Sequence, residues 1–172
     1  MWYYHITYLF NLPSIAEEGL KPGFGQTFKG TWYESYAKGW LFLTSPKGVN
    51  YWTSRLRDHA HANTDHPEDG WVPVVLTFEL PKNIKLEVDT EGSQDAFADA
   101  WKTRGAIPAA AIYIWDREDW QPIEEYNTEA VEEMLEEVKD AGEECFEEDD
   151  PECSWWELDF DYYLPPATAL EE

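Results

Sequence analysis

The sequence predicts an α+β fold, in which short antiparallel strands are interrupted by a few small helices. Four segments are rich in apolar, aromatic and β-branched residues, as strands are: residues 2–9, 40–45, 71–80 and 111–115. Helical patterns lie between some of these segments without regular alternation, so a doubly wound parallel sheet is not expected. The chain has 172 residues and no internal repeat, which suits one domain with its own core.

The first strand and helix follow from local chemistry. Residues 2–9 read WYYHITYL, an alternating segment rich in aromatic and β-branched side chains, which is typical of a strand. Asn11 or Leu12 caps the helix that follows, Pro13 lies in its first turn, and Gly19 ends it. The sequence therefore predicts a strand joined to a short helix at the start of the chain.

The middle of the chain adds one strong strand and several weaker elements. WVPVVLTFEL (71–80) is the clearest strand pattern, and WLFLTS (40–45) has the composition of a buried strand. The remaining expectations are a loop over 26–38, a helix near 47–61, a strand or strand edge at 83–89, a short helix at 93–101, and a strand at 111–115.

The last third of the chain carries most of the negative charge. Residues 117–172 hold 22 acidic and 2 basic residues, whereas residues 1–116 hold 14 and 10. Apolar side chains recur at helical spacing over residues 128–141, and Gly142 predicts the end of that helix. Residues 156–164 alternate like a strand with one apolar face. We expect an acidic helix and strand extension (117–172) packed on a domain formed by residues 1–116.

The charge and composition exclude some functions. A net charge of −24 repels nucleic-acid phosphates and anionic lipid, so direct nucleic-acid or membrane binding is not expected, and a basic protein is the favoured partner. The chain has no apolar run of 18 residues and no secretory signal pattern, which predicts a cytoplasmic protein. Cys145 and Cys153 are then expected to be reduced thiols, although their spacing also permits a disulfide.

His5 lies inside the apolar first strand, where a histidine is either a hydrogen-bonded structural residue or part of a site. The pattern H-x-T, followed by N-L-P-S-I-x-E-x-G-L and a turn, resembles the opening of the ADP-ribosyltransferase superfamily, including its DNA-modifying toxins and the tRNA 2'-phosphotransferases. The resemblance implies a split antiparallel sheet with small helices, and NAD as a substrate. By position, it implies that His5 and Thr7 hold the ribose and nicotinamide end of NAD.

A second segment is similar to the second core strand of the same superfamily. It reads GWLFLTS over residues 39–45. The resemblance implies that Thr44 and Ser45 frame the nicotinamide and that Tyr51 stacks on it. From the residues alone, WLFL is equally well explained as core and the following residues as the start of a helix.

A third segment, RGAIPAAAI (104–112), is similar to one that leads into a late strand in these domains. In the transferases that modify acceptors, a catalytic glutamate lies eight or nine residues before the first apolar residue of this segment. The corresponding residues of this chain include no glutamate. Asp99 or Asp95 takes its place, or a distal glutamate does, or the chemistry is lost. Like the arginines of the 2'-phosphotransferases, three arginines are then candidate anion contacts: Arg104, Arg55 and Arg57.

A histidine-rich segment, DHAHANTDH (58–66), invites a metal-binding interpretation. His59 and His61 are two residues apart in a predicted helix end, which places them on different faces. We therefore expect no metal site.

The resemblance predicts NAD-dependent transfer of ADP-ribose to a macromolecular acceptor, with His5 and Asp99 as catalytic residues. The site for NAD would comprise His5, Thr7, Thr44, Ser45, Tyr51 and Arg104. The alternative is a catalytically inactive binding protein of the same fold whose acidic, aromatic tail engages a basic protein surface, as a nucleic-acid mimic would. NAD-dependent removal of a 2'-phosphate from RNA is disfavoured by the net charge.

Overall fold

The computed structural model describes residues 1–22, 39–64, 69–91, 93, 99–147 and 163–170. Its strands are β1 (Trp2–Tyr8), β2 (Leu41–Thr44), β3 (Pro73–Glu79), β4 (Glu87–Val88), β5 (Ala100–Thr103), β6 (Ile112–Trp115) and β7 (Trp120–Pro122). Its α-helices are α1 (Leu12–Glu18), α3 (Val49–Asn63) and α5 (Thr128–Glu147). Short 3-10 helices are η1 (Leu9–Asn11), η3 (Pro46–Gly48), η5 (Ala109–Ala111), η6 (Ile123–Glu125) and η7 (Ala167–Ala169).

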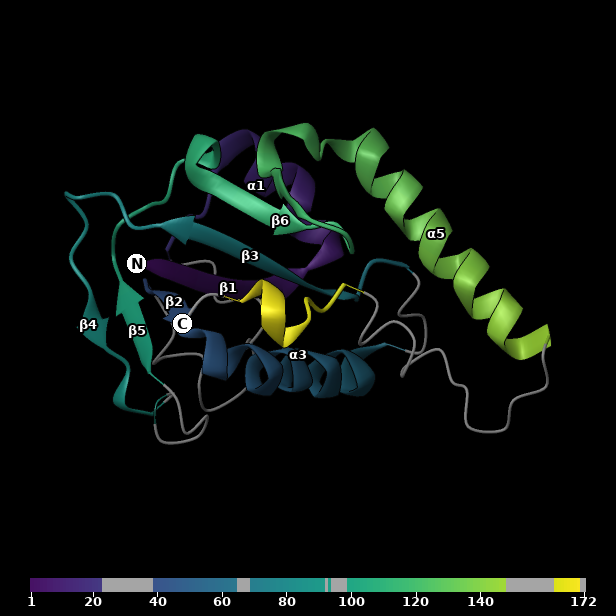
Figure 1. Cartoon of the computed structure of the whole chain (residues 1–172), viewed down its shortest axis with the longest axis horizontal. Coiled ribbons are helices and arrows are strands. Elements are labelled where there is room, and N and C mark those ends of the chain that lie inside the picture. The colour runs from purple at the N-terminus through teal and green to yellow at the C-terminus, as the bar shows by residue number, and fades with distance from the viewer. Residues whose placement is uncertain (23–38, 65–68, 92, 94–98, 148–162, 171–172) are drawn as a thin grey trace.

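The strands form one antiparallel sheet in the order β4-β5-β2-β1-β3-β6-β7, so the expected α+β class is confirmed (Figure 1). β1 pairs with β3 over its whole length, from Trp2 opposite Glu79 to Tyr8 opposite Pro73. On its other side, β1 pairs with β2 only where Tyr4 lies opposite Thr44. The sheet is therefore continuous, but its β4-β5-β2 part is joined to the rest at a single residue pair.

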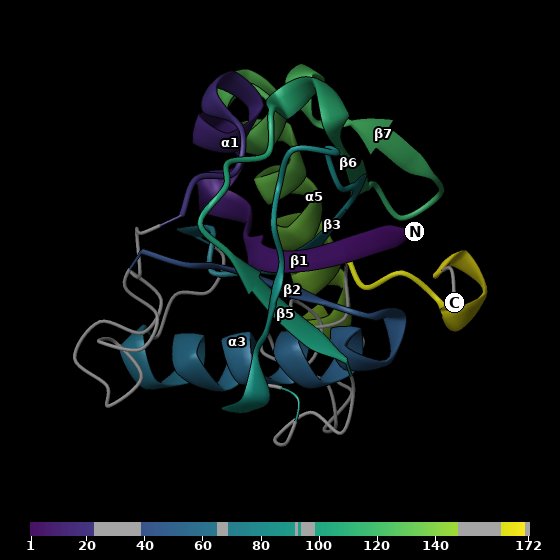
Figure 2. The ribbon, with the colours of Figure 1, turned by 90° about the vertical axis from the view of Figure 1, so that its left-hand side faces the viewer.

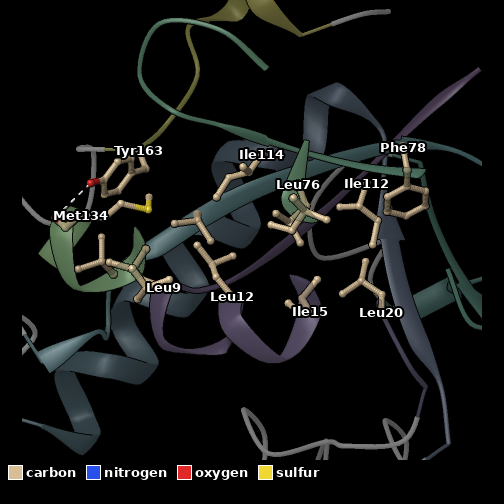
Figure 3. Close-up of a cluster of buried hydrophobic side chains, with 14 of the residues drawn as sticks. Leu9, Leu12, Ile15, Leu20, Leu76, Phe78, Ile112, Ile114, Met134 and Tyr163 are labelled. Carbon is tan, nitrogen blue, oxygen red and sulfur yellow. Dashed lines mark hydrogen bonds between the residues drawn. The ribbon is translucent and has the colours of Figure 1, made fainter. Parts of the chain in front are cut away.

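Helices cover both faces of this sheet. On one face, α1 and α5 bury apolar side chains against β2, β3 and β6 in the larger core, part of which is drawn in Figure 3. On the other face, α3 packs against β1 and β3 and contributes Val49, Leu56 and Ala60. Figure 2 shows α3 on one side of β1 and α1 on the other. The alternation of β1 decides which of its side chains meets which helix layer.

The start of the chain folds as its sequence predicts. Pro13 lies in the first turn of α1, and Gly19 is the residue at its C-terminal end, with φ of +77°. The next residue, Leu20, forms an antiparallel bridge with Ile107. The chain that follows α1 is therefore held against the segment that precedes β6. The glycine is required here because a side chain at this position would collide with the backbone of Ile107.

The acidic helix α5 is longer than predicted. It runs through Gly142 to Glu147, so the predicted end at Gly142 is wrong. A glycine inside a helix costs about 1 kcal/mol and does not end the helix unless the chain also turns there. The predicted apolar stripe does pack: Val131, Met134 and Val138 are buried in the larger core. The Tyr163 hydroxyl donates a hydrogen bond to the Met134 carbonyl at 3.3 Å, which attaches the segment after 162 to this helix (Figure 3).

Other differences concern short strands without a clear pattern of their own. The predicted helix over 93–101 is wrong at its end, where Ala100 and Trp101 belong to β5; most of its other residues lie outside the described ones. Only Glu87–Val88 of the 83–89 segment is a strand, and β7 was not predicted. β5 and β7 are strands because neighbouring strands pair with them. The expectations for 26–38, for most of 156–164 and for the two thiols fall outside the described residues or side chains.

Candidate functional site

The side chains of β1 divide between the two faces of the sheet. Tyr4, Ile6 and Tyr8 belong to the core beneath α3. His5 and Thr7 have the opposite parity, so they lie on the face that carries α1 and α5. The two β1 residues that the resemblance assigns to NAD binding are therefore neighbours on one face.

His5 bridges the place where β1 and β2 separate. It follows Tyr4, the one residue of β1 that pairs with β2, and its Nδ1 lies 2.8 Å from the carbonyl oxygen of Phe42. Because a carbonyl can only accept, the neutral imidazole carries its proton on Nδ1. Nε2 then keeps a lone pair and can accept a hydrogen bond from a ligand hydroxyl.

Burial lowers the pKa of His5 below its ordinary value of 6.5, and the hydrogen bond to Phe42 opposes this shift only in part. The side chain is half-buried. His5 is therefore neutral at pH 7, in the form whose Nε2 is an acceptor.

Ser45 holds a buried hydroxyl with no partner. It continues β2 in an extended conformation, so its side chain points to the face opposite that of Thr44, the face of His5. The residue is 7% exposed. Its Oγ makes no hydrogen bond with any residue that the structure describes. Leaving such a group unsatisfied costs about 1–3 kcal/mol, so a hydrogen-bonding group that reached it would relieve this cost.

Asp99 lies beside Ser45. The Ser45 amide donates a hydrogen bond to the Asp99 carbonyl at 2.9 Å, one residue beyond the pair of Thr44 with Ala100. Asp99 therefore has the same parity as Ser45, and it is exposed. Asp99, one of the residues expected to take the place of the missing glutamate, is thus the backbone partner of Ser45 and directly precedes β5.

Thr7 is less available than His5. It is 7% exposed, and its Oγ1 accepts a hydrogen bond from Asn11 Nδ2 at 3.0 Å. Its hydroxyl proton can still be donated to a ligand. Thr7 thus lies on the correct face, with half of its hydrogen-bonding capacity occupied by the start of α1.

Thr44 and Tyr51 are not brought to this face. Thr44 packs against Gly48 on the α3 side, and its hydroxyl donates to the Ser45 carbonyl at 3.1 Å. The buried residues of α3 include Val49 and Thr53, and Tyr51, midway between them, lies on the outer side of the helix. Tyr51 contacts Trp52 edge to face, with 5.0 Å between ring centroids.

The arginines lie elsewhere as well. Arg104 follows β5 and stacks on Trp40, with its guanidinium carbon 4.1 Å from the ring centroid, at the end of β2 remote from Ser45. Arg55 and Arg57 belong to α3, which covers the opposite face of the sheet. Asp95 lies outside the described residues. No described arginine joins His5, Ser45 and Asp99.

Two aromatic residues of this face were missed by the sequence reasoning. Tyr3 and Trp101 are half-buried and form an edge-to-face pair, with ring centroids 5.1 Å apart. Tyr3 lies two residues before His5 in β1, and Trp101 lies two residues after Asp99, so each pair shares a face of the sheet. The two-residue spacings Tyr3 to His5 and Asp99 to Trp101 could have indicated them once both segments were assigned to strands.

His59 and His61 lie in the C-terminal half of α3. Among the described residues, no group of three or more His, Cys, Asp or Glu side chains is placed to hold a metal ion. His59 instead packs near Tyr8 and Trp71, at ring centroid distances of 6.5 and 6.4 Å. Burial lowers its pKa, and the charge of Arg55 contributes in the same direction.

Comparison with known proteins gives no relative: no protein-family model, curated protein or solved structure matches this chain. In the part of the chain that the structure describes, no helix combines the length and apolarity needed to span a membrane.

The lowered pKa of His5 predicts a pH dependence of stability. A histidine that is neutral in the folded state stabilises the fold above pH 6.5, and this contribution is lost as the pH falls through the folded pKa. The free energy of unfolding of the wild type should therefore fall relative to that of His5→Asn between pH 7.5 and pH 5. Urea titrations of both chains at the two pH values measure the difference. Since all carboxylates are common to both chains, an unchanged difference would contradict the assigned neutral state.

Proposed function

We propose that this chain binds NAD on the His5 face of the sheet and transfers its ADP-ribose to a macromolecular acceptor. The observation that carries the proposal is the Ser45 hydroxyl, which is buried beside Asp99 without a partner among the described residues. A ligand hydroxyl or amide that reached it would satisfy it. The resemblance of the first 20 residues to ADP-ribosyltransferases supports NAD as that ligand.

The side chains of this face fit the nicotinamide riboside end of NAD. His5 Nε2 accepts a hydrogen bond from a ribose hydroxyl, and the fixed Nδ1 contact with Phe42 holds the ring in position. Ser45 Oγ donates to or accepts from the same end of the ligand. Tyr3 and Trp101 offer aromatic surface for the nicotinamide ring, the role first expected of Tyr51.

The reaction breaks the bond between the ribose C1' and the nicotinamide nitrogen, whose bonding electrons leave with neutral nicotinamide. Positive charge develops on the ribose, and the Asp99 carboxylate stabilises this charge or polarises the acceptor. The acceptor then forms the new bond to C1' and loses a proton. Aspartate is one methylene shorter than the family's glutamate. Its carboxylate reaches the ribose only if the ligand binds close to Ser45.

The test is nicotinamide release and transfer of label from ³²P-NAD to macromolecules of a cell lysate. His5→Asn is the informative variant, because the asparagine amide can keep the hydrogen bond to Phe42 while the Nε2 acceptor is lost. We expect wild-type activity to fall by about 10- to 100-fold in this variant. His59→Asn is the matched control: it replaces a half-buried histidine with a lowered pKa on the opposite face, and activity should remain.

A wild-type chain that neither binds NAD nor releases nicotinamide would overturn the proposal. One observation then favours the inactive binding protein: the glutamates of α5 at positions 129, 132, 133, 136 and 137 are exposed. Binding of the full chain to a cationic protein, weakening as salt is raised from 20 to 200 mM, would support that second function.

A further inference from the structure

A cavity lies on the face of the sheet opposite His5. Its volume is about 510 Å³, and strands β1, β3, β6 and β7 form its floor. Register explains why these strands share it: Tyr4 lies opposite Thr77, and Thr77 opposite Tyr113, so one row of side chains crosses three strands. This cavity is separate from the proposed NAD site, because the sheet lies between them.

The walls of the cavity are mainly aromatic. Among the described residues, the aromatic ones that line it are Trp2, Tyr4, Tyr113, Trp115 and Trp120. The rings are arranged at an angle to one another: Trp2 and Tyr113 have centroids 6.1 Å apart with 67° between planes, and Trp115 and Trp120 have centroids 5.3 Å apart with 66°. Rings held at such angles can present faces to a ligand from several directions.

The rim of the cavity is acidic. Glu118 and Asp119 line it from the turn between β6 and β7. This turn is fixed by Asp116, whose Oδ1 accepts hydrogen bonds from the amides of Glu118 and Asp119 at 2.9 and 2.8 Å. None of the described residues that line the cavity carries a positive charge.

The C-terminal segment closes one side. Trp120 Nε1 donates a hydrogen bond to the Ala169 carbonyl at 3.3 Å, and Pro166, Thr168 and Ala169 contribute to the wall. In Figure 2 this segment, drawn in yellow, lies near the N-terminal end of β1. The cavity is therefore built from both ends of the described chain, and it does not require the proposed function.

We propose that this cavity binds an organic cation, an alkylated ammonium or a guanidinium group, between its aromatic walls and the two rim carboxylates. Aromatic faces attract such cations through their ring quadrupoles, more strongly when the cation is partly desolvated. The carboxylates and the net charge of −24 add long-range attraction. The same charges disfavour anionic ligands such as nucleotides.

The cavity is larger than a single ammonium or guanidinium group, so it also holds part of the chain that carries the cation. Two sources supply this chemistry: a free small molecule, or a modified lysine or an arginine of a protein. Both would place the cationic group among the aromatic rings of the cavity that Glu118 also lines. The source decides only whether a peptide backbone improves affinity.

The experiment is a titration of the full chain, followed by the NMR signals of the tryptophan indole N–H groups. The probes are choline and its neutral isostere 3,3-dimethylbutan-1-ol, with N-acetyl-trimethyllysine amide and N-acetylarginine amide as the protein-source arm. We expect choline to bind at least about fivefold more tightly than the neutral isostere, because only choline gains from the ring quadrupoles and carboxylates. Tighter binding of a capped amino acid than of choline would assign the source to a protein.

Two variants test the two parts of the site. Glu118→Gln removes an exposed rim charge without altering the core, and Tyr113→Leu removes a half-exposed ring; each should weaken choline binding by about two- to tenfold. Glu124→Gln, an exposed acid of η6 that does not line the cavity, is the control and should bind choline as the wild type does. Equal binding of choline and the neutral isostere, or choline affinity unchanged in both test variants, would overturn the proposal.

Discussion

Replacing Gly19 by alanine is expected to lower the free energy of unfolding by about 3 kcal/mol or more. The residue has φ of +77° and ψ of −171°, a region that is open almost only to glycine and costs other residues about 1–3 kcal/mol. A Cβ would also lie 2.2 Å from the carbonyl oxygen of Ile107. That oxygen accepts the Leu20 amide, so it cannot move away without loss of the bridge.

Urea denaturation of Gly19→Ala at pH 7 measures this loss. Ser14→Ala is the matched control, since Ser14 is exposed on the same helix and its change should alter the free energy of unfolding by less than about 0.5 kcal/mol. A Gly19→Ala chain as stable as this control would show that the end of α1 is not held against Ile107.

Ser45→Ala is expected to change stability and NAD binding in opposite directions. Removal of a buried hydroxyl without a partner should raise the free energy of unfolding of the unliganded chain by about 1 kcal/mol. The same change removes the contact that we propose with NAD, so NAD affinity should fall by about 5- to 10-fold. Urea titration and isothermal titration calorimetry with NAD measure the two effects on one protein sample.

The neighbouring hydroxyl provides the control for this prediction. Thr44 is 2% exposed, lies on the α3 side and donates its hydroxyl to the Ser45 carbonyl. Thr44→Val should therefore lower stability and leave NAD affinity unchanged. If Ser45→Ala instead behaved like Thr44→Val, the Ser45 hydroxyl would have a structural role and no part in binding.

The parts of the fold that sequence predicted well are those in which one segment contains the whole signal. The alternation of residues 2–8 determined both the strand and the face of each side chain, and Pro13 and Gly19 marked the two ends of α1. β5 and β7 lacked such signals, because four- and three-residue strands are stabilised by the strands that pair with them. Their pairing is a property of the whole sheet.

The candidate site was predictable in part for the same reason. His5 and Thr7 share a strand, so their common face followed from their spacing. The resemblance placed Thr44 and Ser45 in the site together, yet adjacent residues of an extended segment point to opposite faces. The contact of Ser45 with Asp99 depends on the register between β2 and β5, which the sequence of either strand alone does not determine.

The single pair between Tyr4 and Thr44 has a mechanical consequence. Few backbone hydrogen bonds join β1 to β2, so they do little to prevent the two parts of the sheet from twisting relative to each other. The stiffness of this junction comes from apolar packing, to which Leu41 and Leu43 contribute from β2. The hydrogen bond between the His5 side chain and the Phe42 carbonyl also connects β1 to β2. A ligand that binds His5 would therefore act where a single residue pair joins the two parts of the sheet, and the angle between these parts would change when the ligand binds.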